Sequence, residues 1–183
     1  QANFFVKMDD FFQNPSEDKP VFILKGYAGT GKTSLLSAVV KILPHLDLRA
    51  LLLAPTGRAA KVMSTYSGRS AFTIHKIIYK PKGDAGTLGG GFTLQKNYFK
   101  DTLFVVDESS MLADDGGMSG NLLWDLITYT FSGVGNRLLF VGDTAQLPPV
   151  GSQYSPALDA EYLLRHYRLD ADQIELVEVM RQK

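Results

Sequence analysis

Short apolar runs recur at wide spacing along the chain and predict the strands of a sheet. They occupy residues 21–24, 50–53, 103–106 and 138–141, and residues 176–179 are a candidate for a fifth strand. The runs are continuous rather than alternating, which is typical of strands whose two faces are both covered.

Helical patterns lie between these runs. Residues 32–43 carry apolar side chains at the i, i+4 spacing of one helix face, and residues 121–131 and 156–167 are further candidate helices. Strands that alternate with helices predict an α/β fold with a mainly parallel sheet sandwiched by helices. Because such sheets bind ligands at the carboxyl ends of their strands, the segment after each strand is the first place to look for chemistry.

Residues 80–100 interrupt the alternation. They contain three consecutive glycines, which are unfavourable inside a regular element, and strand-like residues 77–79 and 92–94 flank them. This composition favours a β-hairpin inserted between core elements. An irregular loop is the alternative.

The composition excludes several classes of protein. A length of 183 residues with 45% apolar content predicts a single folded domain over residues 1–183. No apolar run reaches the roughly 18–20 residues that cross a bilayer. The absence of cysteine excludes disulfides and thiolate metal sites, and three scattered histidines disfavour zinc. With no signal pattern at the N-terminus, we expect a cytoplasmic protein without a membrane partner.

The formal net charge is zero, but its sign is segregated along the chain. Residues 57–100 hold eight Lys or Arg and one acid, whereas residues 101–183 hold five bases and thirteen acids. A basic stretch of this kind is the electrostatic footprint of a nucleic-acid contact.

The segment after the first strand reads GYAGTGKT and matches the phosphate-binding loop G-x-x-x-x-G-K-T between a strand and a helix. Glycines let backbone N–H groups form an anion nest at the positive end of the helix. We expect the ammonium of Lys32 on the β- and γ-phosphates of ATP and the hydroxyl of Thr33 on Mg²⁺. The predicted nucleotide-binding residues of this loop are Gly26, Ala28, Gly29, Thr30, Gly31, Lys32 and Thr33.

Acidic and amide side chains follow the third and fourth strands. Asp107 is placed to hold Mg²⁺, and Glu108 to polarise a water molecule for attack on the γ-phosphate. Gln146 can donate to a γ-phosphate oxygen and accept from water, which suits a sensor of that phosphate. A plain loop after the fourth strand is an equally good interpretation of that segment taken alone.

The segment after the second strand has two interpretations. Thr56 is a suitable N-cap for a helix that follows it, and capping is the favoured reading. A helix N-terminus that carries Thr, Gly and Arg also suits a phosphodiester backbone.

Taken together, the motifs resemble the first motor domain of the superfamily 1B DNA helicases, the RecD/Dda-like group. That resemblance implies a RecA-like P-loop NTPase fold and an ATP-dependent motor that moves along single-stranded DNA, typically 5′ to 3′. The segments that carry it are GYAGTGKT at 26–33, LAPTGRAAK at 53–61, TIHK at 73–76, VVDESSM at 105–111, GDTAQLPPVG at 142–151 and VMRQ at 179–182.

The resemblance also implies roles at the nucleotide. Lys32, Glu108, Gln146 and Arg181 form its catalytic set, in which Gln146 couples the γ-phosphate to the DNA site and Arg181 reaches that phosphate. Gln1 is matched to a glutamine that reads adenine.

The same resemblance assigns DNA contacts. Pro55, Thr56 and Arg58 lie on the DNA backbone, with His75 and Lys76 nearby. In this family a hairpin inserted before the acidic motif acts as a strand-separating pin. Phe92 of the predicted hairpin is placed to stack on a base.

Motors of this family contain a second RecA-like domain after the RQ segment, and this chain stops there. We therefore expect a fragment that binds Mg-ATP, hydrolyses it slowly and does not unwind duplex DNA alone. The alternatives are a PhoH-like phosphate-loop ATPase and a non-catalytic nucleotide-binding subunit of a recombination or nuclease complex.

Overall fold

Six parallel strands form the central sheet, in the order β3-β2-β6-β7-β1-β8. We describe a computed structural model, which covers residues 2–13, 18–82, 91–114, 121–150 and 153–177. The strands of the sheet are β1 (Val21–Gly26), β2 (Arg49–Ala54), β3 (Ala71–Thr73), β6 (Thr102–Val106), β7 (Arg137–Gly142) and β8 (Ala171–Leu176).

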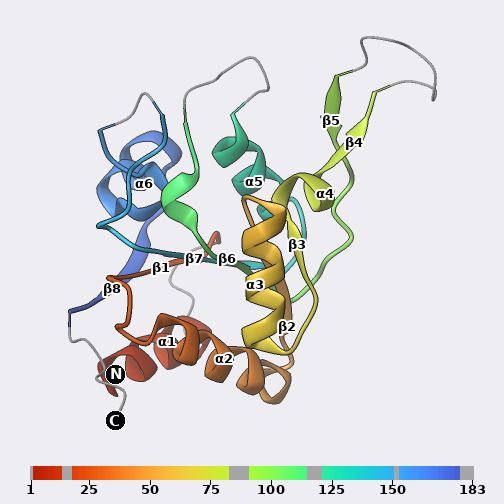
Figure 1. Ribbon diagram of the computed structural model, residues 1–183. Helices are drawn as coiled ribbons and strands as arrows, with labels where there is room; N and C mark the ends of the chain where they lie inside the picture. The colour runs from red at the N-terminus through yellow and green to blue at the C-terminus, as the bar shows by residue number, and fades with distance from the viewer. Residues whose placement is uncertain (1, 14–17, 83–90, 115–120, 151–152, 178–183) are drawn as a thin grey trace.

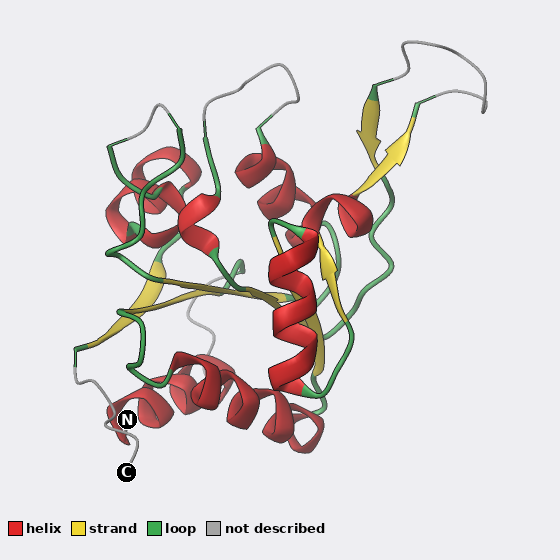
Figure 2. Cartoon of the chain, viewed as in Figure 1, coloured by secondary structure: helices red, strands yellow, loops and turns green. Residues whose placement is uncertain are grey.

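Helices cover both faces of this sheet (Figure 1; Figure 2). One face packs against α1 (Ala2–Gln13), α2 (Lys32–Ile42) and α3 (Gly57–Ser67). The other packs against α4 (Ile74–Ile78), α5 (Leu122–Phe131) and α6 (Ala160–Tyr167). Three short 3₁₀ turns complete the described elements: η1 (Leu43–Leu46), η2 (Ser109–Met111) and η3 (Pro156–Leu158).

The continuous apolar runs reflect this double cover. In β1, Phe22 and Leu24 point into the cluster under α1 and α2, whereas Val21 and Ile23 point into the cluster under α5 and α6. All four are buried. A strand that alternates between two hydrophobic layers needs an apolar residue at every position, and the predicted α/β sandwich is confirmed.

The predicted helices are confirmed, with boundaries set by their caps. The side chain of Asn121 accepts from the N–H of Trp124 at 2.9 Å and begins α5. In the third candidate, the first residues form η3, and Asp159 then caps α6 by accepting from the N–H of Tyr162 at 3.0 Å. The hydrophobic pattern did not predict the helix α1.

The fifth predicted strand, at 176–179, is misplaced within the described residues: Leu176 lies in a strand, Val177 does not, and residues 178–179 lie outside the described part of the chain. The last strand is β8, which pairs with β1 from Ala171 opposite Val21 to Leu176 opposite Gly26. It lies at the edge of the sheet, so its sequence ADQIEL is largely polar and only Leu176 is buried. Hydrophobic runs mark central strands and miss polar edge strands of this kind. The other edge strand, β3, was missed because its three residues are too short to form a run.

The inserted hairpin is confirmed in its two arms. The strands β4 (Tyr79–Pro81) and β5 (Phe92–Leu94) pair antiparallel, with Tyr79 opposite Leu94, and project away from the sheet (Figure 1). Residues 77 and 78 belong to α4 rather than to the hairpin, because Ile78 is buried in the core beside Ile74. Residues 83–90 lie outside the described part of the chain.

Within the described residues, no helix is both long enough and apolar enough to cross a membrane.

Candidate functional site

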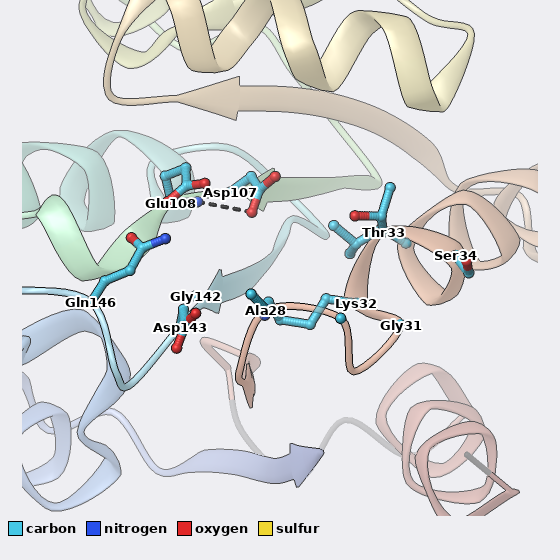
Figure 3. Close-up of a pocket in the computed structure, with 12 residues that line it drawn as sticks. Ala28, Gly31, Lys32, Thr33, Ser34, Asp107, Glu108, Gly142, Asp143 and Gln146 are labelled. Atoms are coloured by element: carbon cyan, nitrogen blue, oxygen red, sulfur yellow. Dashed lines mark hydrogen bonds between the residues drawn. The ribbon is translucent and has the colours of Figure 1, made fainter. Parts of the chain in front are cut away.

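The loops that follow β1, β6 and β7 meet at the carboxyl edge of the sheet and enclose one cavity of about 590 Å³. In Figure 3 the loop after β1 forms one wall, and the acidic pair and Gln146 form the opposite wall. The lining residues are Ala28, Gly29, Gly31, Lys32, Thr33, Ser34, Leu36, Asp107, Glu108, Gly142, Asp143 and Gln146.

Two glycines shape the loop after β1. Gly29 and Gly31 have φ values of 79° and 92°, in the left-handed region that glycine adopts readily. Gly31 is the N-cap of α2 and provides no side-chain cap. The amides of the first helical turn are therefore left for an anion, at the end of the helix where the macrodipole is positive.

The loop is closed by side chains that bond to its own backbone. Lys32 Nζ donates to the carbonyls of Gly26 at 2.5 Å and Tyr27 at 2.9 Å. The Thr30 hydroxyl donates to the Tyr27 carbonyl at 2.7 Å. Thr30 and Gly26 are buried and lie behind the cavity surface, whereas the other predicted residues of this loop line the cavity.

The acidic pair stands directly after β6. The N–H of Asp107 donates to the Leu53 carbonyl at 3.0 Å, which ties the strand end to β2. Glu108 adopts a left-handed φ of 53°, and its N–H donates to Asp107 Oδ1 at 2.9 Å. Burial, followed by the neighbouring charge of Asp107, raises the pKa of Glu108 above its ordinary value.

Gln146 bridges two parts of the site. Its Oε1 accepts from the Ser110 hydroxyl at 3.1 Å. A hydrogen bond between its side chain and Glu108 favours the ionised form of that carboxyl and opposes part of the rise in its pKa. The neutral amide therefore joins the loop after β7, which carries it, to the acidic motif, at the edge where the sequence predicted it.

Sequence reasoning missed three participants. Tyr66 of α3 donates its hydroxyl to Asp107 Oδ2 at 2.7 Å. Ser110 holds Gln146, and Asp143 lines the cavity while accepting from the N–H of Ala145 at 2.8 Å. Asp143 and Ser110 lie inside segments already singled out, so their motif positions were a usable signal. Tyr66 is 41 residues from its partner, and no pattern in the sequence indicates the contact.

The residues predicted to touch DNA backbone flank this site. Thr56 caps α3 by accepting from the N–H of Ala59 at 3.2 Å, so its capping role is confirmed. Arg58 is exposed. Both line a smaller cavity of about 210 Å³ together with Asp107 and Glu108, so the start of α3 adjoins the acidic pair. Pro55 is half-buried at the end of β2.

The remaining predicted contacts lie along α4 and the hairpin. His75 and Lys76 are exposed on α4, and Phe92 is exposed on β5. The rings of His75 and Tyr79 lie 5.3 Å apart, and those of Tyr79 and Phe92 lie 6.3 Å apart. The three rings thus form a row from α4 onto the hairpin. Gln1 and Arg181 lie outside the described residues.

A family model matches this architecture. The model described as an AAA domain covers residues 13–183. The chain belongs to this AAA domain family. The match spans every segment on which the helicase resemblance rests, and that resemblance is confirmed together with the RecA-like fold.

Individual relatives agree with the family assignment. The AAA domain chain is 34% identical over 164 residues to the ATP-dependent RecD2 DNA helicase of Deinococcus radiodurans, covering 87% of this chain and 19% of that protein. It is 28% identical over 171 residues to the ATP-dependent DNA helicase dda of Enterobacteria phage T4, covering 90% of this chain and 36% of that protein. The chain therefore spans less than half of either relative.

Solved structures share the fold. The AAA domain aligns with Bacteroides Pif1 bound to single-stranded DNA at a TM-score of 0.55 and 20% identity, covering 97% of this chain and 42% of that one. It aligns with the Pif1 helicase from Candida albicans at a TM-score of 0.55 and 23% identity, covering 97% and 40%.

Proposed function

We propose that this domain is the ATP-binding and ATP-hydrolysing half of a helicase motor that acts on single-stranded DNA. The observation that carries the proposal is the single cavity in which Lys32 and Thr33, the acidic pair Asp107–Glu108 and Gln146 meet from three different strand ends. Each supplies a different part of phosphoryl-transfer chemistry: charge, metal ligation, a base and a sensor.

The loop after β1 binds the phosphate chain of ATP in this proposal. The Lys32 ammonium rests on two neutral carbonyls of its own loop. A triphosphate would offer it an anionic partner instead, and charge-assisted hydrogen bonds are about twice as strong as neutral ones. The first-turn amides of α2 would bind the same phosphates.

The donor set of the cavity fits Mg²⁺. Thr33 and Asp107 both line it and provide hard oxygen ligands, a hydroxyl and a carboxylate. The described residues contain no group of three or more His, Cys, Asp or Glu able to hold a metal by themselves. A metal bound through one or two protein groups and substrate phosphates matches the way Mg²⁺ binds in ATPases. When bound, Mg²⁺ neutralises charge on the phosphates.

Glu108 is the general base in this proposal. The pKa of Glu108 is raised above that of an ordinary glutamate and so lies closer to neutral pH, which makes this carboxylate a better proton acceptor from water. Gln146 contacts that base and Ser110 of the acidic motif, so a change at the γ-phosphate is passed to the loop after β7.

Single-stranded DNA is the proposed second ligand. Residues 57–100 carry the excess of positive charge, and the exposed side chains of Arg58, His75, Lys76 and Phe92 lie within them. Two of the proteins similar to this domain are named as DNA helicases, and one solved relative is bound to single-stranded DNA. Aromatic rings interleaved with basic residues are typical of such surfaces.

A second RecA-like domain of the same full-length protein is the proposed partner for hydrolysis and movement. The helicases similar to this chain are longer than it, since the chain covers 19% and 36% of them. An arginine supplied to the γ-phosphate contributes on the order of 10³–10⁵ in rate. We propose that Arg181 and an arginine of the second domain both reach the γ-phosphate. Without the second domain, ATP hydrolysis should be slow.

The decisive experiment measures single-stranded DNA affinity with and without a non-hydrolysable ATP analogue, on the wild type and on Gln146→Ala. We expect the analogue to change the wild-type Kd by about 5- to 10-fold, an ordinary coupling between two sites, and to leave the Kd of the variant unchanged. Gln13→Ala is a matched control, since Gln13 is an exposed amide at the end of α1 that lines neither this cavity nor the neighbouring one that Gln146 also lines. A wild-type affinity that ignores the analogue contradicts the proposed coupling.

A further inference from the structure

Tyr66 reaches the acidic pair from the last turn of α3. Its hydroxyl donates to Asp107 Oδ2 at 2.7 Å, while the N–H of Glu108 donates to Asp107 Oδ1 at 2.9 Å. Two donors on different oxygens fix the rotation of the carboxylate about its Cβ–Cγ bond. A carboxylate has roughly four acceptor positions, so two remain for other partners.

Tyr66 is itself held from two sides. Its ring packs against the hydrophobic cluster beneath α1 and α2. Its backbone carbonyl accepts from the Ser37 hydroxyl of α2 at 3.3 Å, and α2 is the helix that begins with Lys32. Packing between the helices therefore fixes the position of the Tyr66 hydroxyl, which does not rotate freely at the surface.

The other end of α3 adjoins the same acidic pair. Thr56 and Arg58 line the 210 Å³ cavity with Asp107 and Glu108. The helix thus touches Asp107 through Tyr66 in its last turn and carries the proposed DNA contacts at its start.

We propose that Tyr66 is a positioning residue that holds the Asp107 carboxylate ready for Mg²⁺ and ties the metal site to α3. The inference rests on the proposed function of the cavity as a Mg-ATP site. Tyr66 does not line that cavity, so it acts through Asp107.

The test removes one oxygen atom. Binding of a fluorescent non-hydrolysable ATP analogue is titrated with Mg²⁺ in the wild type and in Tyr66→Phe. Loss of an outer partner of a metal ligand lowers metal affinity about 10-fold or more, so the Mg²⁺ midpoint should rise by about that factor. Affinity for the analogue in EDTA should stay at the wild-type value, because the loop after β1 is untouched.

Asp107→Asn gives a second readout. In that background Tyr66→Phe should cause no further change in the Mg²⁺ midpoint, since the two residues act at one point. Tyr98→Phe is the matched control, because Tyr98 is an exposed tyrosine that does not line the cavity. Thermal unfolding of every variant without ligand separates loss of fold from loss of metal affinity.

The outcomes are distinct. An unchanged Mg²⁺ midpoint in Tyr66→Phe, or an equal loss of affinity with and without Mg²⁺, overturns the inference while leaving the proposed function standing. A wild type that binds no nucleotide at any Mg²⁺ concentration overturns the proposed function, and this inference with it.

Discussion

Gly26 stands where β1 ends and the phosphate loop begins, at a point where no side chain fits. A Cβ at this position would lie 2.6 Å from Thr30 Oγ1 and 3.1 Å from both the Cβ and the carbonyl oxygen of Leu176. The loop is thus pressed between its own threonine and the edge strand β8. The first glycine of the motif is therefore needed for packing.

We expect Gly26→Ala to destabilise the fold by about 1–3 kcal/mol, the usual effect of overpacking a well-filled site. Urea unfolding followed by circular dichroism measures the change. Gly57→Ala is the control, because a Cβ there meets nothing within 4 Å and alanine favours the helix. Equal stability of Gly26→Ala and the wild type would show that β8 moves away easily.

At the scale of elements, the hairpin is anchored at its base rather than along its length. The Tyr79 hydroxyl donates to Asp125 Oδ2 of α5 at 2.5 Å. The N–H of Gln95 donates to the Ile78 carbonyl at 2.9 Å, and its side chain donates to the Ile77 carbonyl. These bonds fix the direction of β4 and β5 against the body of the domain, which leaves Phe92 exposed beyond them.

We predict that Phe92→Ala weakens binding to an oligothymidylate by about 5- to 150-fold, because stacking of one base on an aromatic ring contributes about 1–3 kcal/mol. Fluorescence anisotropy gives the Kd. Val134→Ala is the control, since Val134 is an exposed apolar residue before β7, at the sheet edge opposite the strand carboxyl ends. Wild-type affinity in Phe92→Ala would exclude this ring as a stacking platform.

Across the whole molecule, like charges also meet far from the cavity, where they repel one another. Asp172 of the edge strand β8 lies near Asp10 of α1 and Asp170. Partial burial, followed by the charges of these two aspartates, raises the pKa of Asp172 above 3.8, and Lys7 opposes part of this rise. Its ionised form is therefore disfavoured in the folded state.

The pH dependence of this effect has a definite sign. The folded pKa lies above the unfolded one, so below pH 3.8 both states are protonated and Asp172 has no effect. Above its folded pKa the penalty is fully present. Asp172→Asn should therefore raise the Tm at pH 7 by at most about 2 °C, since solvent screens an exposed charge.

Differential scanning calorimetry between pH 7 and pH 4 measures this difference, which should shrink as the pH falls. Asp9→Asn serves as the control, because Asp9 is an exposed aspartate of the same helix as Asp10. A gain in Tm that is constant across this range would point to a cause other than ionisation.

The amino-acid sequence alone determined the central strands and the chemistry at their ends. Strands buried on both faces need continuous apolar runs, and a phosphate loop needs its glycines and Lys32 at fixed spacing, so both leave a mark in one dimension. Only the tertiary structure decided the edge strand β8, whose polar sequence carries no such mark. It alone also brought Tyr66 to Asp107, because packing between α3 and the sheet joins residues that no local spacing relates.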